Sequence, residues 1–163
     1  MKAEVKITQK DIQAYMFYTI YHSFTGILSI VLGVLTIGMG VFYLVNHSNT
    51  GILFLVMAVI FFALEPIMIL VQSKAQASNP VFEKATFYLF EEDKLEAWQE
   101  GVEHASVKWT DLYAMVKDGD HYYILFDKVR ANIVPANAFS AGDAAAFEEL
   151  VKRKLPKNKR KGF

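Results

Sequence analysis

Cysteine is missing from the sequence, which excludes disulfides and thiolate metal sites. Histidine is sparse, and no two histidines lie three or four residues apart, so a helical metal-binding pair and the His-Glu-x-x-His motif are absent. The histidines are His22, His47, His104 and His121. His104 and His121 could meet across strands, but we interpret them as exposed strand residues. We therefore predict no metal site and no cofactor.

A glycine-rich phosphate-binding loop is also lacking, because Gly33, Gly38 and Gly40 lie within an apolar run. The acidic residues of the second half are scattered along expected turns and strand faces, which is typical of solvated surface. Trp98 and Trp109 could line a ligand surface, although tryptophans in strands usually belong to a core or an interface. No catalytic constellation is present, and we expect a non-enzymatic protein.

Charge is almost absent from residues 24–71, where Glu65 is the single charged residue. Ionised side chains cost several kcal/mol at the centre of a bilayer, so membrane insertion requires this segregation. The apolar runs 24–45 and 51–71 each have the roughly 20 residues that cross a hydrocarbon core. Neither has the polar stripe that a core helix of a soluble protein would need. We predict an antiparallel transmembrane hairpin over residues 24–71, with the short polar turn 46–50 at its tip.

Basic residues flank the hairpin on one side only: Lys2, Lys6 and Lys10 precede it, Lys74 follows it, and the turn has none. By the positive-inside rule, both termini are predicted to be cytoplasmic. The first 23 residues do not read as a cleavable signal peptide. Within this cytoplasmic segment, 1–23, alternation over residues 2–7 indicates an edge strand. Thr8 and Asp11 form a capping box, so an interfacial helix is expected to start near residue 9 and run into the first span.

Aromatic residues gather at both ends of the first span, as they do in membrane interfaces. The expected inner belt contains Tyr15, Phe17, Tyr18, Tyr21 and His22, and the outer belt contains Phe42 and Tyr43.

Small residues recur at spacings of three and four in the first span, which places them on one helix face suited to close packing. They are Gly26, Ser29, Gly33, Thr36 and Gly40. The tight turn sets Glu65 at the depth of residue 31, between Ser29 and Gly33, so we predict that Glu65 faces the hairpin interior near Ser29. Two interpretations stay open. Glu65 is either a protonatable or partner-binding carboxylate, or a neutral acid bonded to Ser29 or to backbone freed by Pro66.

After a polar linker at residues 72–80, the hydrophobic period changes to two, which indicates a small antiparallel β-sheet over a domain at 81–155. The expected strands are 84–90, 95–100, 105–109, 112–117, 122–126 and 130–134, joined as a meander. An amphipathic helix follows from Ala141, with Ser140 and Asp143 as a capping box and Pro156 as its stop. The predicted class is an α+β membrane protein: a hairpin followed by a sheet and a capping helix.

The last segment is strongly basic, and no acidic residue follows Glu149. Its cations are Lys152, Arg153, Lys154, Lys157, Lys159, Arg160 and Lys161. They could contact anionic lipid headgroups, which contribute up to about 1 kcal/mol per residue. Alternatively, the tail at 156–163 is disordered and solvated. Nucleic-acid binding is not expected, because the body of the domain is acidic.

The two spans are followed by Lys-Trp-Thr-Asp-Leu at 108–112, Ile-Val-Pro at 133–135 and a terminal amphipathic helix. This arrangement resembles the bacterial YcxB-like family. The resemblance implies a multi-pass protein of the bacterial cytoplasmic (inner) membrane with a pleckstrin-homology-like domain, and it implies no activity. Pleckstrin-homology domains that bind inositol phosphates carry basic residues in the first hairpin loop. This chain has Glu91, Glu92 and Asp93 there, which argues against headgroup binding by that route.

Two functional hypotheses follow from this architecture. In the first, the chain is an interaction or regulatory protein that presents its cytoplasmic domain to a protein partner. In the second, it is a membrane immunity or protection protein whose hairpin binds a membrane-inserted toxin or another membrane polypeptide. The lipid bilayer is a partner in both, and the small-residue face could also support a homo-oligomer.

Overall fold

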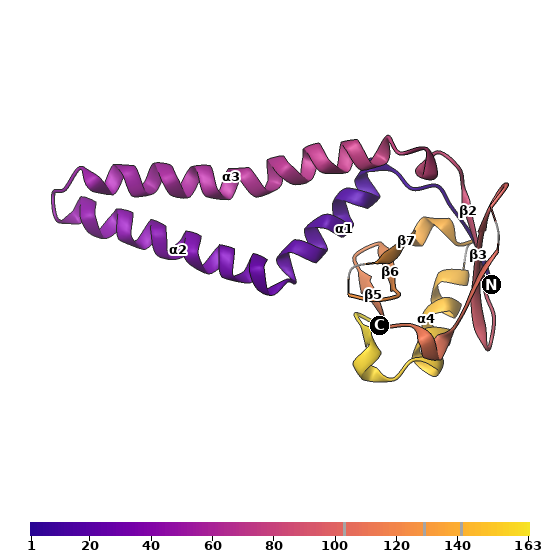
Figure 1. Ribbon diagram of the computed structural model, residues 1–163. Coiled ribbons are helices and arrows are strands. Elements are labelled where there is room, and N and C mark those ends of the chain that lie inside the picture. The colour runs from indigo at the N-terminus through magenta and orange to yellow at the C-terminus, as the bar shows by residue number, and fades with distance from the viewer. Residues whose placement is uncertain (103, 129, 141) are drawn as a thin grey trace. The chain divides into compact units, whose positions relative to one another are not determined.

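The computed structural model describes residues 1–102, 104–128, 130–140 and 142–163, and the chain forms two compact units. The hairpin unit comprises Met16–Ala75, and the β unit comprises Met1–Tyr15 together with Gln76–Phe163. The predicted α+β class is confirmed, because two long apolar helices precede antiparallel sheets and a C-terminal helix (Figure 1). The tail at 156–163 and part of the N-terminal segment therefore belong to the same folded body as the central strands.

Helix α1 spans Gln9–Tyr21 and begins at the predicted capping box. The Thr8 hydroxyl donates to Asp11 Oδ2 at 2.6 Å, and the Thr8 amide donates to the same oxygen at 2.7 Å. The expectation that this helix runs into the first span is wrong. Ser23 caps a new helix by accepting from the Gly26 amide at 3.0 Å. A glycine is needed there, since an added Cβ would lie 1.9 Å from the Ile20 carbonyl oxygen.

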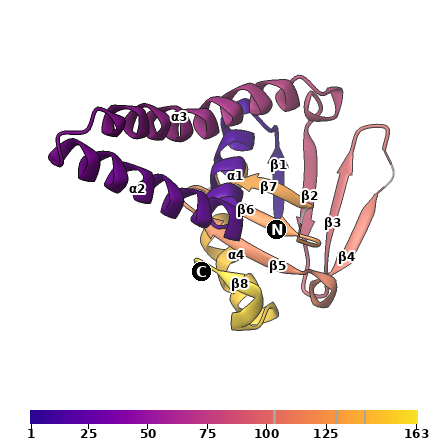
Figure 2. The same ribbon diagram turned by 60° about the vertical axis from the view of Figure 1, so that its left-hand side comes forward.

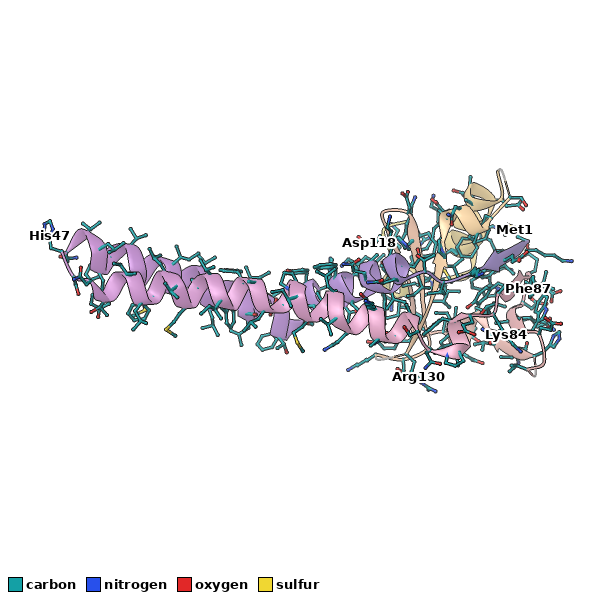
Figure 3. The ribbon with its side chains drawn as sticks, turned by 90° about the horizontal axis from the view of Figure 1, so that it is seen from above. Met1, His47, Lys84, Phe87, Asp118 and Arg130 are labelled. Atoms are coloured by element: carbon teal, nitrogen blue, oxygen red, sulfur yellow. The ribbon has the colours of Figure 1, made fainter. Side chains whose placement is uncertain are left out.

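Helices α2 (Phe24–Val45) and α3 (Thr50–Ala77) form the antiparallel hairpin, with His47 at its tip in a left-handed conformation (φ 56°) (Figure 3). The bounds of α2 are those predicted. Helix α3 continues past the predicted linker start, so most of 72–80 is helical. The residues from Gln72 to Ala77 are good helix formers, and the first strong breaker is Pro80.

The first sheet contains four antiparallel strands in the order β1-β2-β3-β4 (Figure 2). Their bounds are β1 Lys2–Val5, β2 Thr86–Phe90, β3 Lys94–Gln99 and β4 Ala105–Lys108. Strand β1 pairs with β2 from Lys2 opposite Leu89 to Val5 opposite Thr86. The expected edge strand is thus present, and it joins the two sequence-distant parts of the β unit.

The second sheet has the order β7-β6-β5-β8. Its strands are β5 Ala114–Asp118, β6 His121–Leu125, β7 Ala131–Pro135 and β8 Arg160–Lys161. The single meander predicted from the sequence is wrong, because the short helix η2 (Trp109–Asp111) ends β4 and turns the chain into this second sheet. Strand β8 is parallel to β5. Gly119 and Asp120 form the turn between β5 and β6, with Gly119 at φ 54°, and such tight hairpins favour glycine there.

Helix α4 spans Asp143–Lys154, and Phe147, Leu150 and Val151 bury its apolar stripe. The predicted Ser140–Asp143 capping box does not form. Gly142 occupies the cap at φ 90° without a side-chain bond, and the Asp143 amide donates to the Ser140 carbonyl at 3.0 Å. Ala141, the predicted start of the helix, lies outside the described residues. Three further single-turn helices are η1 Pro80–Phe82, η3 Ala136–Ala138 and η4 Lys157–Lys159.

One hydrophobic core joins both sheets and α4 within the β unit. The ring centroid of Phe90, from the first sheet, lies 4.6 Å from that of Phe147 in α4. The ring centroid of Tyr122, from the second sheet, lies 5.0 Å from the same point. Aromatic rings that pack at these distances contribute beyond the burial of their area. Because each sheet contacts the same helical side chain, α4 closes the core from the open side of both.

The close approach of α2 and α3 gives a stability prediction. Gly51→Ala should lower the free energy of unfolding, because the added Cβ would lie 2.5 Å from the Gly40 carbonyl oxygen and 2.8 Å from the Leu44 backbone nitrogen. Overpacking of this kind costs about 1–3 kcal/mol. Equilibrium unfolding of the detergent-solubilised protein measures the change.

Gly38→Ala is the matched control, since its added Cβ meets no described atom within 4 Å. Alanine should raise stability there by about 0.5–1 kcal/mol through helix propensity. Equal losses in the two variants would contradict the packing at Gly51.

Candidate functional site

In the interior of the hairpin unit, small residues of α2 pack against larger residues of α3. An added Cβ at Gly33 would lie 2.4 Å from the Phe62 ring, and one at Gly40 would lie 2.7 Å from the Leu55 side chain. The structure therefore brings these two glycines of the predicted face against α3. The remaining small residues of that face do not all do the same.

Two members of the predicted face, Gly26 and Thr36, contact the backbone of residues that come before them in the chain rather than α3. Gly26 closes against the Ile20 carbonyl, and the Thr36 hydroxyl donates to the Leu32 carbonyl of its own helix at 2.8 Å. A threonine in an apolar helix commonly satisfies its hydroxyl in this way. The face is therefore a packing surface at Ser29, Gly33 and Gly40 rather than along its whole length.

Glu65 faces the hairpin interior and contacts Ser29, as its depth in the sequence predicts. The Ser29 hydroxyl donates to Glu65 Oε1 at 2.5 Å. The preceding and following turns of α3 continue through Pro66 without a break in the helix. One of the two carboxyl oxygens of Glu65 thus has a donor inside the hairpin unit. The contact agrees with the second interpretation of Glu65, in which the acid is hydrogen-bonded to Ser29.

The outer surface of the hairpin unit is largely apolar over residues 24–71. Only 11% of the residues in the most apolar stretch of α2, and 11% in that of α3, are buried. Phe24, Val45 and Val59 are each at least 70% exposed. A core helix of a soluble protein would be mostly buried, so this exposure favours an apolar surrounding. Both helices are long and apolar enough to cross a membrane.

The basic segment does not form the disordered tail that was one of the two expectations. Lys159 donates to the carbonyls of Thr110 at 3.0 Å and Leu112 at 2.8 Å, next to the strand β8. Beyond it, the Phe163 ring stacks on Tyr122 at 6.0 Å. Gly162 adopts φ 83°, and an added Cβ there would lie 2.1 Å from the Lys117 carbonyl oxygen. An apolar residue after a run of lysines was the sequence signal for this docking.

Three of the basic residues on α4 are paired with acidic residues. Arg153 and Lys154 contact Glu92 at 3.0 and 2.6 Å, and Lys152 contacts Glu149 at 2.8 Å. The hydrogen bond from Lys154 and the charge of Arg153 hold the pKa of Glu92 below its ordinary value. The acidic turn after β2 therefore serves as the counter-charge for the end of α4.

Side chains from the first half of α1 contact the second sheet of the β unit. His121 Nε2 lies 2.9 Å from Asp11 Oδ1, and the rings of Tyr15 and Tyr123 meet edge to face at 5.0 Å. Two expectations are corrected here. His121 is a partly buried partner of Asp11 rather than an exposed strand residue, and Tyr15 packs on a strand rather than serving in an aromatic belt. His104 stacks on Trp98 at 5.1 Å.

The pKa of Asp11 is lowered from its ordinary value. Burial alone would raise it, but the hydrogen bonds from Thr8 and His121 and the charge of His121 outweigh that effect. A lowered pKa in the folded state means that ionised Asp11 favours folding above its unfolded pKa, and that this contribution is lost as the pH falls below it. The capping box and the Asp11–His121 pair thus share one carboxylate.

Among the described residues, no group of three or more metal-ligating side chains comes together. The polar contacts of the β unit are structural pairs, and they join elements of that unit to one another. The surface features that remain for recognition are an exposed strand edge at β4 and an open apolar cavity beside the first sheet.

Comparison with known proteins gives one match. Residues 90–151 match the family described as YcxB-like protein, which confirms the resemblance over the region from the end of β2 to α4. No curated protein and no solved structure matches the chain significantly.

The Ser29–Glu65 contact predicts a measurable coupling. Ser29→Ala should destabilise the hairpin by about 0.5–1.5 kcal/mol in detergent, because Glu65 loses its internal donor. In a Glu65→Ala background the same substitution should cost little, and the double-mutant cycle isolates the pair. Thr36→Ala, which removes a bond within one helix, should show no coupling to Glu65→Ala. Additive effects of Ser29→Ala and Glu65→Ala would contradict the contact.

The Asp11–His121 pair predicts a pH-dependent stability. At about pH 7, Asp11→Asn should lower the free energy of unfolding by about 1 kcal/mol, since it weakens both the cap and the pair. The difference from wild type should shrink as the pH falls below the ordinary aspartate value of 3.8, where the wild-type carboxylate also becomes protonated. Thermal unfolding followed by circular dichroism across this range tests it. A difference that stays constant at low pH would contradict the assignment.

Proposed function

We propose that this chain is a non-enzymatic interaction protein of the bacterial cytoplasmic membrane, which presents a pleckstrin-homology-like β unit to a protein partner. The support is architectural. The β unit has two four-stranded sheets and one helix over a shared core, and its residues 90–151 match the YcxB-like family. Several described polar side chains of the β unit, such as Asp11, Glu92 and Glu148, are engaged in pairs within that unit.

The observation that carries this proposal is the insertion of the hairpin unit between two paired strands. Strand β1 precedes residues 16–75 and β2 follows them, yet the two strands are neighbours in one sheet. One folded sheet cannot lie on both sides of a bilayer, so both ends of the hairpin must emerge on the same side. The flanking bases Lys2, Lys6, Lys10 and Lys74 favour the cytoplasm as that side.

The partner surface that the geometry favours is the edge of the first sheet. Strand β4 ends the sheet order, and Ala105, Ser106 and Lys108 are exposed along it. An edge strand carries backbone groups that can pair with an added strand. A protein partner with an extended segment would dock here through main-chain hydrogen bonds, with its side chains alternating over the two faces.

The basic segment of α4 and the tail supplies a weaker part of the proposal, contact with anionic lipid headgroups. Lys157 and Lys161 are exposed. Glu92 and Glu149 pair with three neighbouring cations and offset two of their three charges, so the net attraction is smaller than the sequence alone implies.

A membrane immunity or protection role is the second hypothesis, and it would place a partner against the hairpin. The Ser29–Glu65 hydrogen bond does not favour it, because the one acid of the spans is occupied inside the hairpin. A partner would have to displace that bond or use the apolar outer face. The two hypotheses therefore differ in which unit is replaceable.

Site-specific photocrosslinking in the native membrane tests the proposal. A photoreactive amino acid at Ser106 of β4 should capture a protein partner, whereas the same probe at Glu149, which is exposed on α4, should capture little. Replacing residues 24–71 with an unrelated two-span hairpin should leave the Ser106 product unchanged. Loss of that product on the span exchange, with partner capture inside the hairpin, would support the immunity hypothesis instead. A product of twice the chain mass would identify a homo-oligomer.

A further inference from the structure

The β unit contains an open cavity of about 340 Å³ that the functions above do not use. It is formed by the start of α1, the short helix η1, the outer part of β2, β3 and β4, and β7. Ile12, Tyr15, Val81, Trp98, Ala105 and Ile133 are among its lining residues. None of the described residues that line it is charged. A volume of this size lies within the range of small-ligand pockets in proteins.

Several polar groups in the cavity wall are hydrogen-bonded within the protein. Gln99 Nε2 donates to Thr86 Oγ1 at 2.8 Å and to the Val81 carbonyl at 3.0 Å. The Tyr88 side chain is hydrogen-bonded to Asn132, and burial raises its pKa. An occupant therefore gains no hydrogen bond from these groups, and it need not offer one. The chemistry of the wall selects an uncharged, apolar occupant.

The cavity is lined by the residues at which the chain leaves and re-enters the β unit. Tyr15 is the last residue of this unit before the hairpin, and Gln76 is the first after it. Helix α3 is continuous from the apolar run to Gln76, which follows Val71 by five residues in the sequence. If the apolar run lies in a membrane, lipid hydrocarbon surrounds the part of the chain that comes just before this cavity wall in the sequence.

We propose that the cavity binds the hydrocarbon chain of a bilayer lipid. The uncharged lining, the hydrogen-bonded polar groups of the wall and the short separation in sequence from the apolar spans all point to this occupant. The proposal requires that the hairpin spans a membrane, but it does not depend on the protein partner at β4. Exposed Val81 and Val102, each 58% exposed, give the rim an apolar surface over which a chain can enter.

The two tryptophans of the chain provide a direct test, because both lie outside the hairpin unit. Trp98 lines the cavity, whereas Trp109 is 3% exposed in the core and donates to the Glu91 carbonyl at 3.0 Å. The full-length protein is reconstituted in phosphatidylcholine vesicles whose acyl chains carry bromine near the terminal methyl group. Bromine quenches tryptophan on contact, so emission should fall relative to unbrominated vesicles. Trp98→Phe should abolish that loss.

A pair of neighbouring substitutions separates cavity binding from surface contact. Successive residues of a strand point to opposite faces, so Ala105→Phe fills the cavity and Ser106→Phe does not. Ala105→Phe should remove most of the loss of emission, and Ser106→Phe should leave it unchanged. Val102→Asp, which places a charge on the rim, should act like Ala105→Phe and serves as the second variant if the first folds poorly.

Three outcomes would overturn the proposal. The first is tryptophan emission of the wild-type protein that is the same in brominated and unbrominated vesicles, whether or not a polypeptide that covers Trp98 copurifies. Another is a loss of emission that persists in both Ala105→Phe and Val102→Asp, which would place Trp98 against lipid at the surface. The last is a loss that also remains in Trp98→Phe.

Discussion

The pairing of β1 with β2 is the constraint on which the rest of the structure depends. These strands lie on either side of the hairpin unit in the sequence, and their register joins Lys2 to Leu89. The first sheet is therefore complete only when both ends of the chain's long insertion return to one place. The shared core of Phe90, Tyr122 and Phe147 then fixes the second sheet and α4 to it. Removal of β1 would expose an edge and open this core from the side of Ala3 and Val5.

Within the β unit, the same polar groups are used for two purposes. Asp11 caps α1 and also holds His121, so the position of a helix start and its attachment to a strand are set by one carboxylate. Glu92 similarly takes two cations from the end of α4 and positions the acidic turn against it. Polar groups engaged in this way stabilise the fold by joining elements that are distant in the sequence.

Regular periodicity made much of this fold predictable from the sequence. The uncharged runs located the hairpin, and the depth relation across its short turn placed Glu65 beside Ser29. Alternation located the strands, but it carries no information on where a meander divides, so the turn at Trp109 and the two-sheet arrangement were missed. The predicted C-terminal end of α3 is too early. Polar residues alone do not end a helix, and Gln72–Ala77 contain no glycine or proline. The cavity at Trp98 depends on contacts between distant elements and had no local signal.

The insertion of the hairpin also orders events during biosynthesis. Strand β1 is made first and has no partner until the ribosome has passed both apolar helices and reached β2. The β unit can therefore fold only after both helices of the hairpin unit have been made. Completion of the first sheet thus depends on synthesis of the whole hairpin unit.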